Sequence, residues 1–343
     1  MRRPVIARPA PAAHRTALAA VAAATLLLVG SACSSGQERQ PVHADSAAPK
    51  ATASTGHRPS PSVDCFRTTP PRATGRYAFG GRSYLLKRPN NDGRTAAPLI
   101  LDFHGLRSTA FTQAVYGRMS DTGAARGFIV VEPESVPARR GWKLPGMRDG
   151  TEDIAYVRTL LDHLESTLCV DTSREYATGM SNGAGLAAAL ICGLDGRLAG
   201  VAPVAGLNLA RPCEGAPPTT IVAFHGTADR IVPYRGGEPF SGDRRQIPAW
   251  MRPSDGVFAL PAVPDLATRW ARAFGCGTGS HHTTGPITRL THPGCRGGVR
   301  VDLYTVTDGG HTWPGSLPLG IGSTTTRIDA TKIILDTFTA PSR

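Results

Sequence analysis

The alternation of strand-like and helix-like segments constrains the fold of this chain more than any other feature. Short apolar runs typical of buried parallel strands recur at residues 98–103, 128–133, 200–205, 220–225 and 300–306. Between the second and third runs, apolar residues from Ile154 to Leu168 are spaced three and four apart, as on one face of an amphipathic helix. Strands that alternate with helices pair in parallel through crossover connections. The sequence therefore predicts an α/β domain with a doubly wound, mostly parallel sheet and helices on both faces.

Three further segments complete the predicted domain. The stretch "RYAFGGRSYLLKRP", residues 76–89, predicts a β-hairpin whose turn lies at Gly80 and Gly81. Helical patterns at residues 266–274 and 329–338 are expected to pack against the sheet.

The first 63 residues differ in composition from the rest. Residues 1–33 combine arginines, an apolar run and small residues before Cys33, which is typical of an export signal. "LVGSAC" also approximates the box that precedes a lipid-modified cysteine in bacterial lipoproteins, so lipidation at Cys33 and plain cleavage both stay open. Residues 34–63 are rich in Ser, Ala and Pro and predict a disordered tether. Residues 64–343 then form one folded domain, and we expect a secreted or surface-anchored monomer.

Charge and cysteines narrow the classes of function. The net charge is +12, but the basic residues are scattered and nearly all arginine, which does not indicate a nucleic-acid-binding surface. No C-x-x-C motif occurs, and "SHH" at residues 280–282 is expected to be a solvated loop, so we predict no metal site and no cofactor.

Six cysteines follow Cys33, an even number in a chain bound for an oxidising compartment. We predict a disulfide between Cys276 and Cys295, which flank one loop. The other predicted pairs are Cys192 with Cys213 and Cys65 with Cys169.

The stretch "YATGMSNGAG" contains a G-x-S-x-G motif centred on Ser181. A strand-like segment precedes it and a helical run follows it, which places Ser181 on a sharp turn between strand and helix, where a nucleophilic serine stands in many hydrolases. Gly179 and Gly183 lack the Cβ atoms that would clash where strand and helix approach. A serine nucleophile needs an imidazole base and a carboxylate that orients it.

Both partners of the serine occur downstream in the expected order. Asp229 follows the strand-like run at residues 220–225, and His311 follows the run at residues 300–306. Each lies at the carboxyl end of a strand, the sheet edge that carries active sites in open α/β folds. Asp308 competes with Asp229 for the role of the acid, but it is only three residues from His311 and would have to fold back on it. The sequence therefore predicts a catalytic triad of Ser181, Asp229 and His311.

Ester or amide hydrolysis also needs N–H donors that stabilise the developing oxyanion. We predict the main-chain N–H of Asn182, next to the nucleophile, and that of Leu106, after the turn at His104 and Gly105. The side chain of His104 is expected to brace that turn.

The stretches "CVDTSREYATGMSNGAG", "FHGTADRIVPY" and "GGHTWPG" together resemble the secreted polyhydroxybutyrate depolymerase and feruloyl esterase group of α/β hydrolases. The likeness spans about residues 65–338. It implies an α/β-hydrolase fold, with Ser181 as nucleophile, Asp229 as acid and His311 as base. The residues after the His-Gly turn, Leu106 and Arg107, depart from the small or polar residues that relatives often carry.

The sequence thus favours a secreted serine esterase that works without a cofactor on a small or polymeric ester. A serine peptidase with the same triad and an inactive hydrolase-like binding module are the alternatives. The Gly- and Pro-rich stretch at residues 235–263 predicts a long loop beside the site. Its aromatic residues, Trp250 among them, together with Trp142 and Trp313, are expected either to form an apolar wall that contacts short acyl or hydroxycinnamoyl groups or only to anchor the loop to the core.

Overall fold

The structure, a computed structural model, describes residues 60–67, 72–253, 256 and 258–340. The predicted export signal, with Cys33, and most of the predicted tether lie outside the described residues. Among the residues described, none of the helices has the length and apolar character that a membrane span requires.

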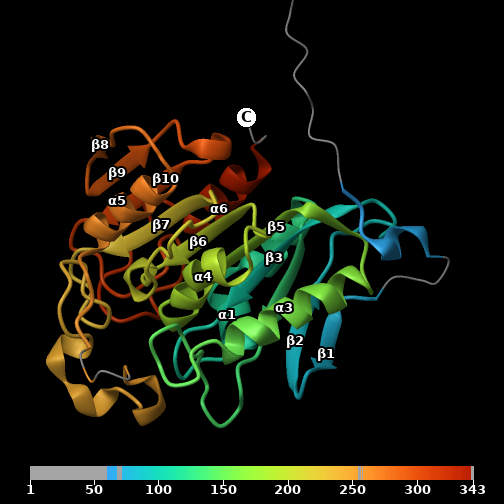
Figure 1. The fold of residues 1–343 in the computed structure, drawn as a ribbon, viewed down its shortest axis with the longest axis horizontal. Helices are drawn as coiled ribbons and strands as arrows, with labels where there is room; N and C mark the ends of the chain where they lie inside the picture. The colour runs from blue at the N-terminus through green and yellow to red at the C-terminus, as the bar shows by residue number, and fades with distance from the viewer. Residues whose placement is uncertain (1–59, 68–71, 254–255, 257, 341–343) are drawn as a thin grey trace, which may run out of the picture. The chain divides into compact units, whose positions relative to one another are not determined.

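The described strands form one ten-stranded sheet in the order β1-β2-β4-β3-β5-β6-β7-β10-β9-β8 (Figure 1). The strands are β1 (Gly75–Phe79), β2 (Arg82–Lys87), β3 (Ala97–Phe103), β4 (Ile129–Pro133), β5 (Val170–Met180), β6 (Gly200–Val204), β7 (Thr220–Gly226), β8 (Ser280–Thr284), β9 (Ile287–His292) and β10 (Val301–Val306). Neighbouring strands pair in parallel from β4 through β3, β5, β6 and β7 to β10, and antiparallel at both ends of the sheet. The predicted mostly parallel sheet is therefore confirmed, and its strand order is that of an α/β hydrolase.

Helices cover both faces of this sheet (Figure 1). They are α1 (Ala110–Gly117), α2 (Met119–Ala125), α3 (Glu152–Glu165), α4 (Asn182–Gly193), α5 (Val263–Ala273) and α6 (Ala330–Thr339). Leu99, Leu101 and Phe103 of β3 point into one core with α3, α4 and α5. Ile100 points into the other core, with residues of α1, α2 and α6. Because successive strand residues alternate between faces, the apolar runs of the sequence serve two cores at once.

The predicted hairpin at residues 76–89 is formed by β1 and β2, and Gly80 and Gly81 both have a positive φ in its turn. The expectation of a loop at residues 280–282 is wrong, because these residues belong to the edge strand β8. Every side chain of β8 is exposed, and its main chain pairs with β9. An edge strand held by main-chain hydrogen bonds needs no apolar side chains, so it left no strand pattern in the sequence.

The predicted tether extends too far toward the domain, because its last residues belong to the fold. The N–H of Ser62 donates to the carbonyl oxygen of Val170 at 2.8 Å, and the hydroxyl of Ser62 donates to Leu168. The N–H of Thr172 donates to the carbonyl oxygen of Ser60. Main-chain pairing to the start of β5 therefore fixes residues 60–63 without any large apolar side chain.

Three disulfides join distant parts of the described chain. They are Cys65 with Cys169, Cys192 with Cys213, and Cys276 with Cys295. All three predicted pairings are confirmed.

Candidate active site

Ser181 is the single residue between the end of β5 at Met180 and the start of α4 at Asn182. Its backbone has φ 57° and ψ −121°, a conformation that costs a residue with a side chain about 1–3 kcal/mol. A Cβ on Gly179 or Gly183 would overlap the carbonyl oxygen of Phe103. The predicted sharp, strained turn with its two flanking glycines is therefore confirmed.

Asp229 and His311 meet at the same sheet edge, beyond the carboxyl ends of β7 and β10. His311 Nδ1 lies 2.7 Å from Asp229 Oδ2, and both residues are buried. The other oxygen, Oδ1, accepts the N–H groups of Ile231 and Val232 and so closes the turn that carries the acid. The competitor Asp308 is exposed and its N–H donates to Thr227 instead. The structure thus pairs His311 with Asp229.

The surroundings of Asp229 keep it ionised. Burial raises the pKa of this carboxyl, but contacts with the rings of His225 and His311 outweigh the burial and hold the pKa below its ordinary value. Asp229 can therefore accept a hydrogen bond from Nδ1–H of His311, which leaves Nε2 as an acceptor for a serine proton. His225 Nε2 lies 2.8 Å from the carbonyl oxygen of Val232 and 3.3 Å from Asp229 Oδ2, so this ring also braces the acid turn.

The third link of the triad is open in this structure. Within the described part of the chain, Ser181 Oγ makes no hydrogen bond, to His311 or to any other residue. Links between nucleophile and base are often loose before substrate binds. The structure therefore joins the acid to the base and places the serine on the same edge of the sheet.

The two predicted oxyanion donors lie beside the serine. A Cβ on Gly105 would stand 3.4 Å from the Cβ of Ser181, so the turn before Leu106 touches the nucleophile. Among the described residues, neither the N–H of Leu106 nor that of Asn182 has a hydrogen-bond acceptor. Two unengaged donors near a nucleophile are what an oxyanion requires.

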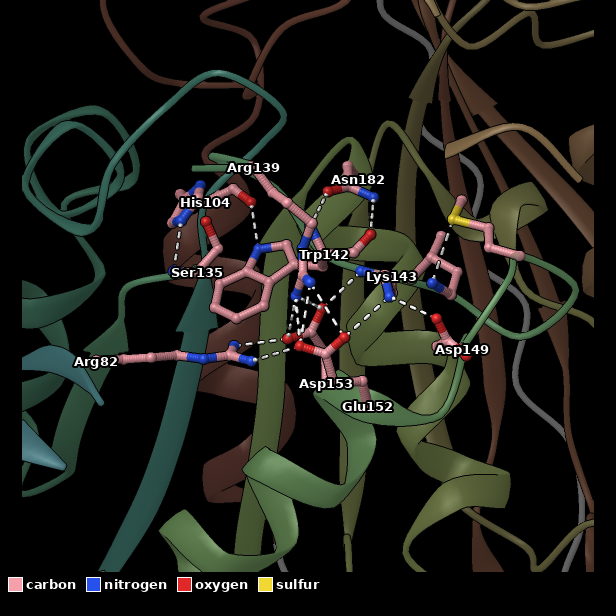
Figure 2. Close-up of polar contacts among 12 residues, drawn as sticks. Arg82, His104, Ser135, Arg139, Trp142, Lys143, Asp149, Glu152, Asp153 and Asn182 are labelled. Atoms are coloured by element: carbon pink, nitrogen blue, oxygen red, sulfur yellow. Dashed lines mark hydrogen bonds and ion pairs between the residues drawn. The ribbon is translucent and has the colours of Figure 1, made fainter. Parts of the chain in front are cut away.

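His104 braces the turn, as expected. Burial lowers the pKa of its ring, which favours the neutral form. Its Nε2 accepts the N–H of Ser135 (Figure 2). Nδ1 therefore carries the proton and lies 2.8 Å from the carbonyl oxygen of Gly105.

A small apolar cavity of about 30 Å³ opens at Ser181. It is lined by Leu106, Leu144, Met147, Ser181, Asn182, Leu209, Ile231, Val232, Pro239, Phe240, Met251 and Phe258. Four of these residues belong to the stretch at 235–263, which the sequence predicts to lie beside the site. That placement is confirmed.

The three predicted tryptophan contacts have different outcomes. Trp142 and Trp313 are 0% and 1% exposed and belong to the two cores, so the expectation that they form a substrate-facing wall is wrong. The indole N–H of Trp313 donates to Thr331, and that of Trp142 donates to the carbonyl oxygen of His104 (Figure 2). Trp250 is half-buried and stands beside Gly141, close to Leu106 and Asn182 at the edge of the site.

The structure also brings polar residues to the site that the sequence did not reveal. Arg82 and Asp153 lie far apart in the chain and form an ion pair near Trp142 (Figure 2). Neither stands in a motif, and an acidic residue in the first turn of a helix is ordinary. No local signal could have identified them.

Comparison with known proteins groups this chain with esterases. The family model described as Esterase PHB depolymerase matches residues 82–216, a range that includes Ser181. The chain is 30% identical over 193 residues to the probable feruloyl esterase C of Aspergillus niger, covering 52% of this chain and 68% of the relative. It is 29% identical over 240 residues to feruloyl esterase B of Piromyces equi, covering 67% of this chain and 42% of the relative. The chain thus spans less than half the length of the Piromyces protein.

Among solved structures, the acetyl xylan esterase from Aspergillus awamori is one that matches this chain. It shares 14% sequence identity, has a TM-score of 0.49, and is matched over 68% of this chain and 89% of its own.

Proposed function

Because this chain belongs to the family of esterases that contains polyhydroxybutyrate depolymerases and feruloyl esterases, we propose that it hydrolyses carboxylic esters through an acyl-enzyme on Ser181. The observation that carries this proposal is the buried, hydrogen-bonded pair of Asp229 and His311. The pair lies at the same edge of the sheet as Ser181, whose backbone is strained and whose side chain lines a cavity. No metal or cofactor takes part in the proposed reaction.

The reaction would have two steps, acylation of Ser181 and hydrolysis of the acyl-enzyme. His311 Nε2 removes the proton of Ser181 Oγ, and the oxygen attacks the ester carbonyl carbon. The N–H groups of Asn182 and Leu106 stabilise the resulting oxyanion, and protonated His311 gives its proton to the departing alcohol. Water then attacks the carbonyl carbon of the acyl-enzyme while His311 takes its proton, and the return of this proton to Ser181 Oγ releases the acid. Asp229 stays ionised throughout and stabilises the imidazolium.

The cavity at Ser181 supports short acyl groups as substrates. The small apolar cavity of about 30 Å³ favours a short acyl group, whereas a hydroxycinnamoyl group requires side chains such as Phe240 and Phe258 to move. The relatives are named feruloyl esterases, so both acyl types stay within the proposal. Trp250, at the edge of the site, is a proposed contact for the alcohol part of the ester.

We also propose that the enzyme works outside the cell. Three disulfides in the described chain are typical of proteins from oxidising compartments. The predicted export signal agrees with this location, and lipid attachment at Cys33 would hold the enzyme at the cell surface.

The test compares a chromogenic acetyl ester with a chromogenic peptide, using the wild-type enzyme and Ser181→Ala. We expect hydrolysis of the ester alone, and Ser181→Ala should lower turnover by several orders of magnitude with little change in melting temperature. Preference for the peptide would favour a peptidase, and no turnover of either would favour a binding module. Near-wild-type ester turnover in Ser181→Ala would refute the proposed mechanism.

A further inference from the structure

A short segment, Arg139 to Lys143, connects the two proposed oxyanion donors. The side chain of Asn182 makes two hydrogen bonds to the main chain of Trp142. Asn182 Oδ1 accepts the N–H of Trp142 at 2.6 Å, and Asn182 Nδ2 donates to the carbonyl oxygen of Trp142 at 2.9 Å. On the other side, the indole N–H of Trp142 donates to the carbonyl oxygen of His104 at 2.9 Å. Figure 2 shows Trp142 between His104 and Asn182.

A second hydrogen bond ties the same segment to the turn of Leu106. The N–H of Arg107 donates to the carbonyl oxygen of Arg140 at 2.6 Å. A displacement of the Arg139–Lys143 segment would therefore move both N–H donors with respect to Ser181. The orientation of the oxyanion hole depends on what holds this segment.

Asp153, in the first turn of α3, is the group that holds it. Its carboxylate is fully buried, and Oδ2 accepts the main-chain N–H of Lys143 at 2.6 Å. Arg139 Nη2 lies 3.2 and 3.3 Å from its two oxygens. The side chain of Asp153 thus binds both ends of the segment, at Arg139 and at Lys143.

Two arginines compensate the buried charge of Asp153. Arg82 Nη1 lies 2.6 Å from Asp153 Oδ1 as an ion pair, and its guanidinium stacks 4.0 Å from the centre of the Tyr156 ring. Glu152 pairs with Arg139 and Lys143 on the outer side of this network (Figure 2). Loss of the Asp153 charge would leave the buried Arg82 and the partly buried Arg139 with Glu152 as their remaining shared carboxylate, and both would have to move.

We propose that Asp153 is a positioning residue that fixes the oxyanion hole through the Arg139–Lys143 segment. This inference rests on the proposed esterase function. Asp153 itself contacts neither substrate nor Ser181, and it acts through Trp142, Asn182 and the turn of Leu106. Its effect should therefore appear in the stabilisation of the tetrahedral intermediate and not in the binding of the ester.

The test is Asp153→Asn, with kcat and KM for an acetyl ester expressed per enzyme titrated to completion with a fluorophosphonate. We expect kcat to fall about 10- to 100-fold, because small misplacements of a catalytic array have effects of this size, while KM changes less than about threefold. The inhibition constant of a trifluoromethyl ketone, whose adduct places an oxyanion in the same site, should rise by the same factor as kcat/KM falls.

Asp302 supplies a matched control. It is also a buried carboxylate paired with two arginines, Arg289 at 2.8 Å and Arg300 at 3.0 Å, but it lies at the amino end of β10, away from the oxyanion turn. Asp302→Asn should lower the melting temperature and leave kcat and the inhibition constant unchanged. If Asp153 served stability alone, Asp153→Asn would also lower the melting temperature and leave kcat and the inhibition constant unchanged.

A second variant covers a failure of Asp153→Asn to fold. Arg139 is partly accessible, so Arg139→Gln should fold and show the same split between kcat and KM, with a loss of about threefold to tenfold. Wild-type kcat and inhibition constant in both variants, beside an inactive Ser181→Ala, would overturn the inference and leave the proposed function intact. Absence of ester hydrolysis in the wild-type enzyme would overturn both.

Discussion

At the scale of single residues, Asp229 and Asn182 each combine a structural contact with a proposed role in the site. Asp229 uses one oxygen to close its own turn and the other to orient His311. The N–H of Asn182 is a proposed oxyanion donor, and the side chain of Asn182 holds the main chain of Trp142. Because one contact fixes each of these two groups, neither would need to rearrange when charge develops in the proposed reaction.

The acid can be tested by paired substitutions. Asp229→Asn should lower kcat about 10²- to 10⁴-fold, because a neutral amide cannot stabilise the imidazolium and favours the wrong tautomer of His311. Asp308→Asn should leave kcat unchanged, since Asp308 is exposed and contacts Thr227. Steady-state kinetics of the two purified variants decide the assignment, and the opposite result would make Asp308 the acid.

A buried carboxyl outside the site should make stability depend on pH. Burial raises the pKa of Glu132, on β4, to about 7, above its value of about 4.3 in an unfolded chain. Protonated Glu132 therefore favours the folded state below about pH 4, and this contribution is lost as the pH rises through 7. The neighbouring Asp102 has its pKa raised as well, by burial and by the charge of Glu132.

Replacement of Glu132 by a neutral isostere should remove this dependence. At pH 8 we expect Glu132→Gln to exceed the wild-type protein in free energy of unfolding by about 1–3 kcal/mol, and to match it near pH 4. Urea unfolding at both pH values measures the difference. The same gain at pH 4 as at pH 8 would contradict a role for ionisation.

At the scale of elements, the stretch from 235 to 263 shapes the cavity at Ser181, which is the proposed acyl side of the site. Phe240, Met251 and Phe258 line the cavity at Ser181. A second cavity of about 400 Å³ adjoins it, and the two share Leu144, Met147, Leu209 and Phe258 as walls. The size of the accepted acyl group should therefore depend on the shared wall.

Removal of one shared side chain tests this dependence. Phe258→Ala should connect the two cavities and raise the relative turnover of six- and eight-carbon acyl esters over acetyl esters. Phe240→Ala is the matched control, because Phe240 lines the cavity at Ser181 but not the second one. The measurement is turnover against acyl chain length for both variants. An equal increase for longer acyl esters in both would show that the shared wall does not set acyl size.

At the scale of the whole molecule, the disulfide between Cys276 and Cys295 does not line the cavity at Ser181 and is expected to serve stability. Cys276 and Cys295 are 19 residues apart and join the end of α5 to the segment after β9. Replacement of both by serine should lower the free energy of unfolding by about 2–4 kcal/mol, because the unfolded chain regains a loop of that size. The kcat for an acetyl ester should not change. Peptide mapping without reduction checks the pairing, and free thiols at both positions would disprove it.

The export segment makes a separate prediction. If acylation anchors the enzyme, Cys33→Ser should move esterase activity from the membrane fraction to the medium. Fractionation of cells that express the wild-type and variant chains measures the distribution. The same distribution for both chains would favour plain cleavage of the signal.

The sequence by itself determined the features that local chemistry encodes. Apolar runs and helical spacing predicted the sheet and its helices, and glycines around Ser181 predicted the strained turn. The order of Ser181, Asp229 and His311 along the chain predicted that they would share one edge of the sheet. These predictions succeeded because a strand's length, a turn's need for glycine and the direction of parallel strands follow from neighbouring residues.

Only the tertiary structure decided which side chains face the substrate and which face the core. Trp313 lies two residues after His311, and Trp142 bonds to the turn at His104, yet the packing of two sheet faces buries both. Asp153 has no motif of its own, and it gained a role because folding brings Arg82 from β2 and the Arg139–Lys143 segment to its carboxylate. Contacts between elements distant in sequence depend on how whole layers pack, and a local pattern carries no record of that packing.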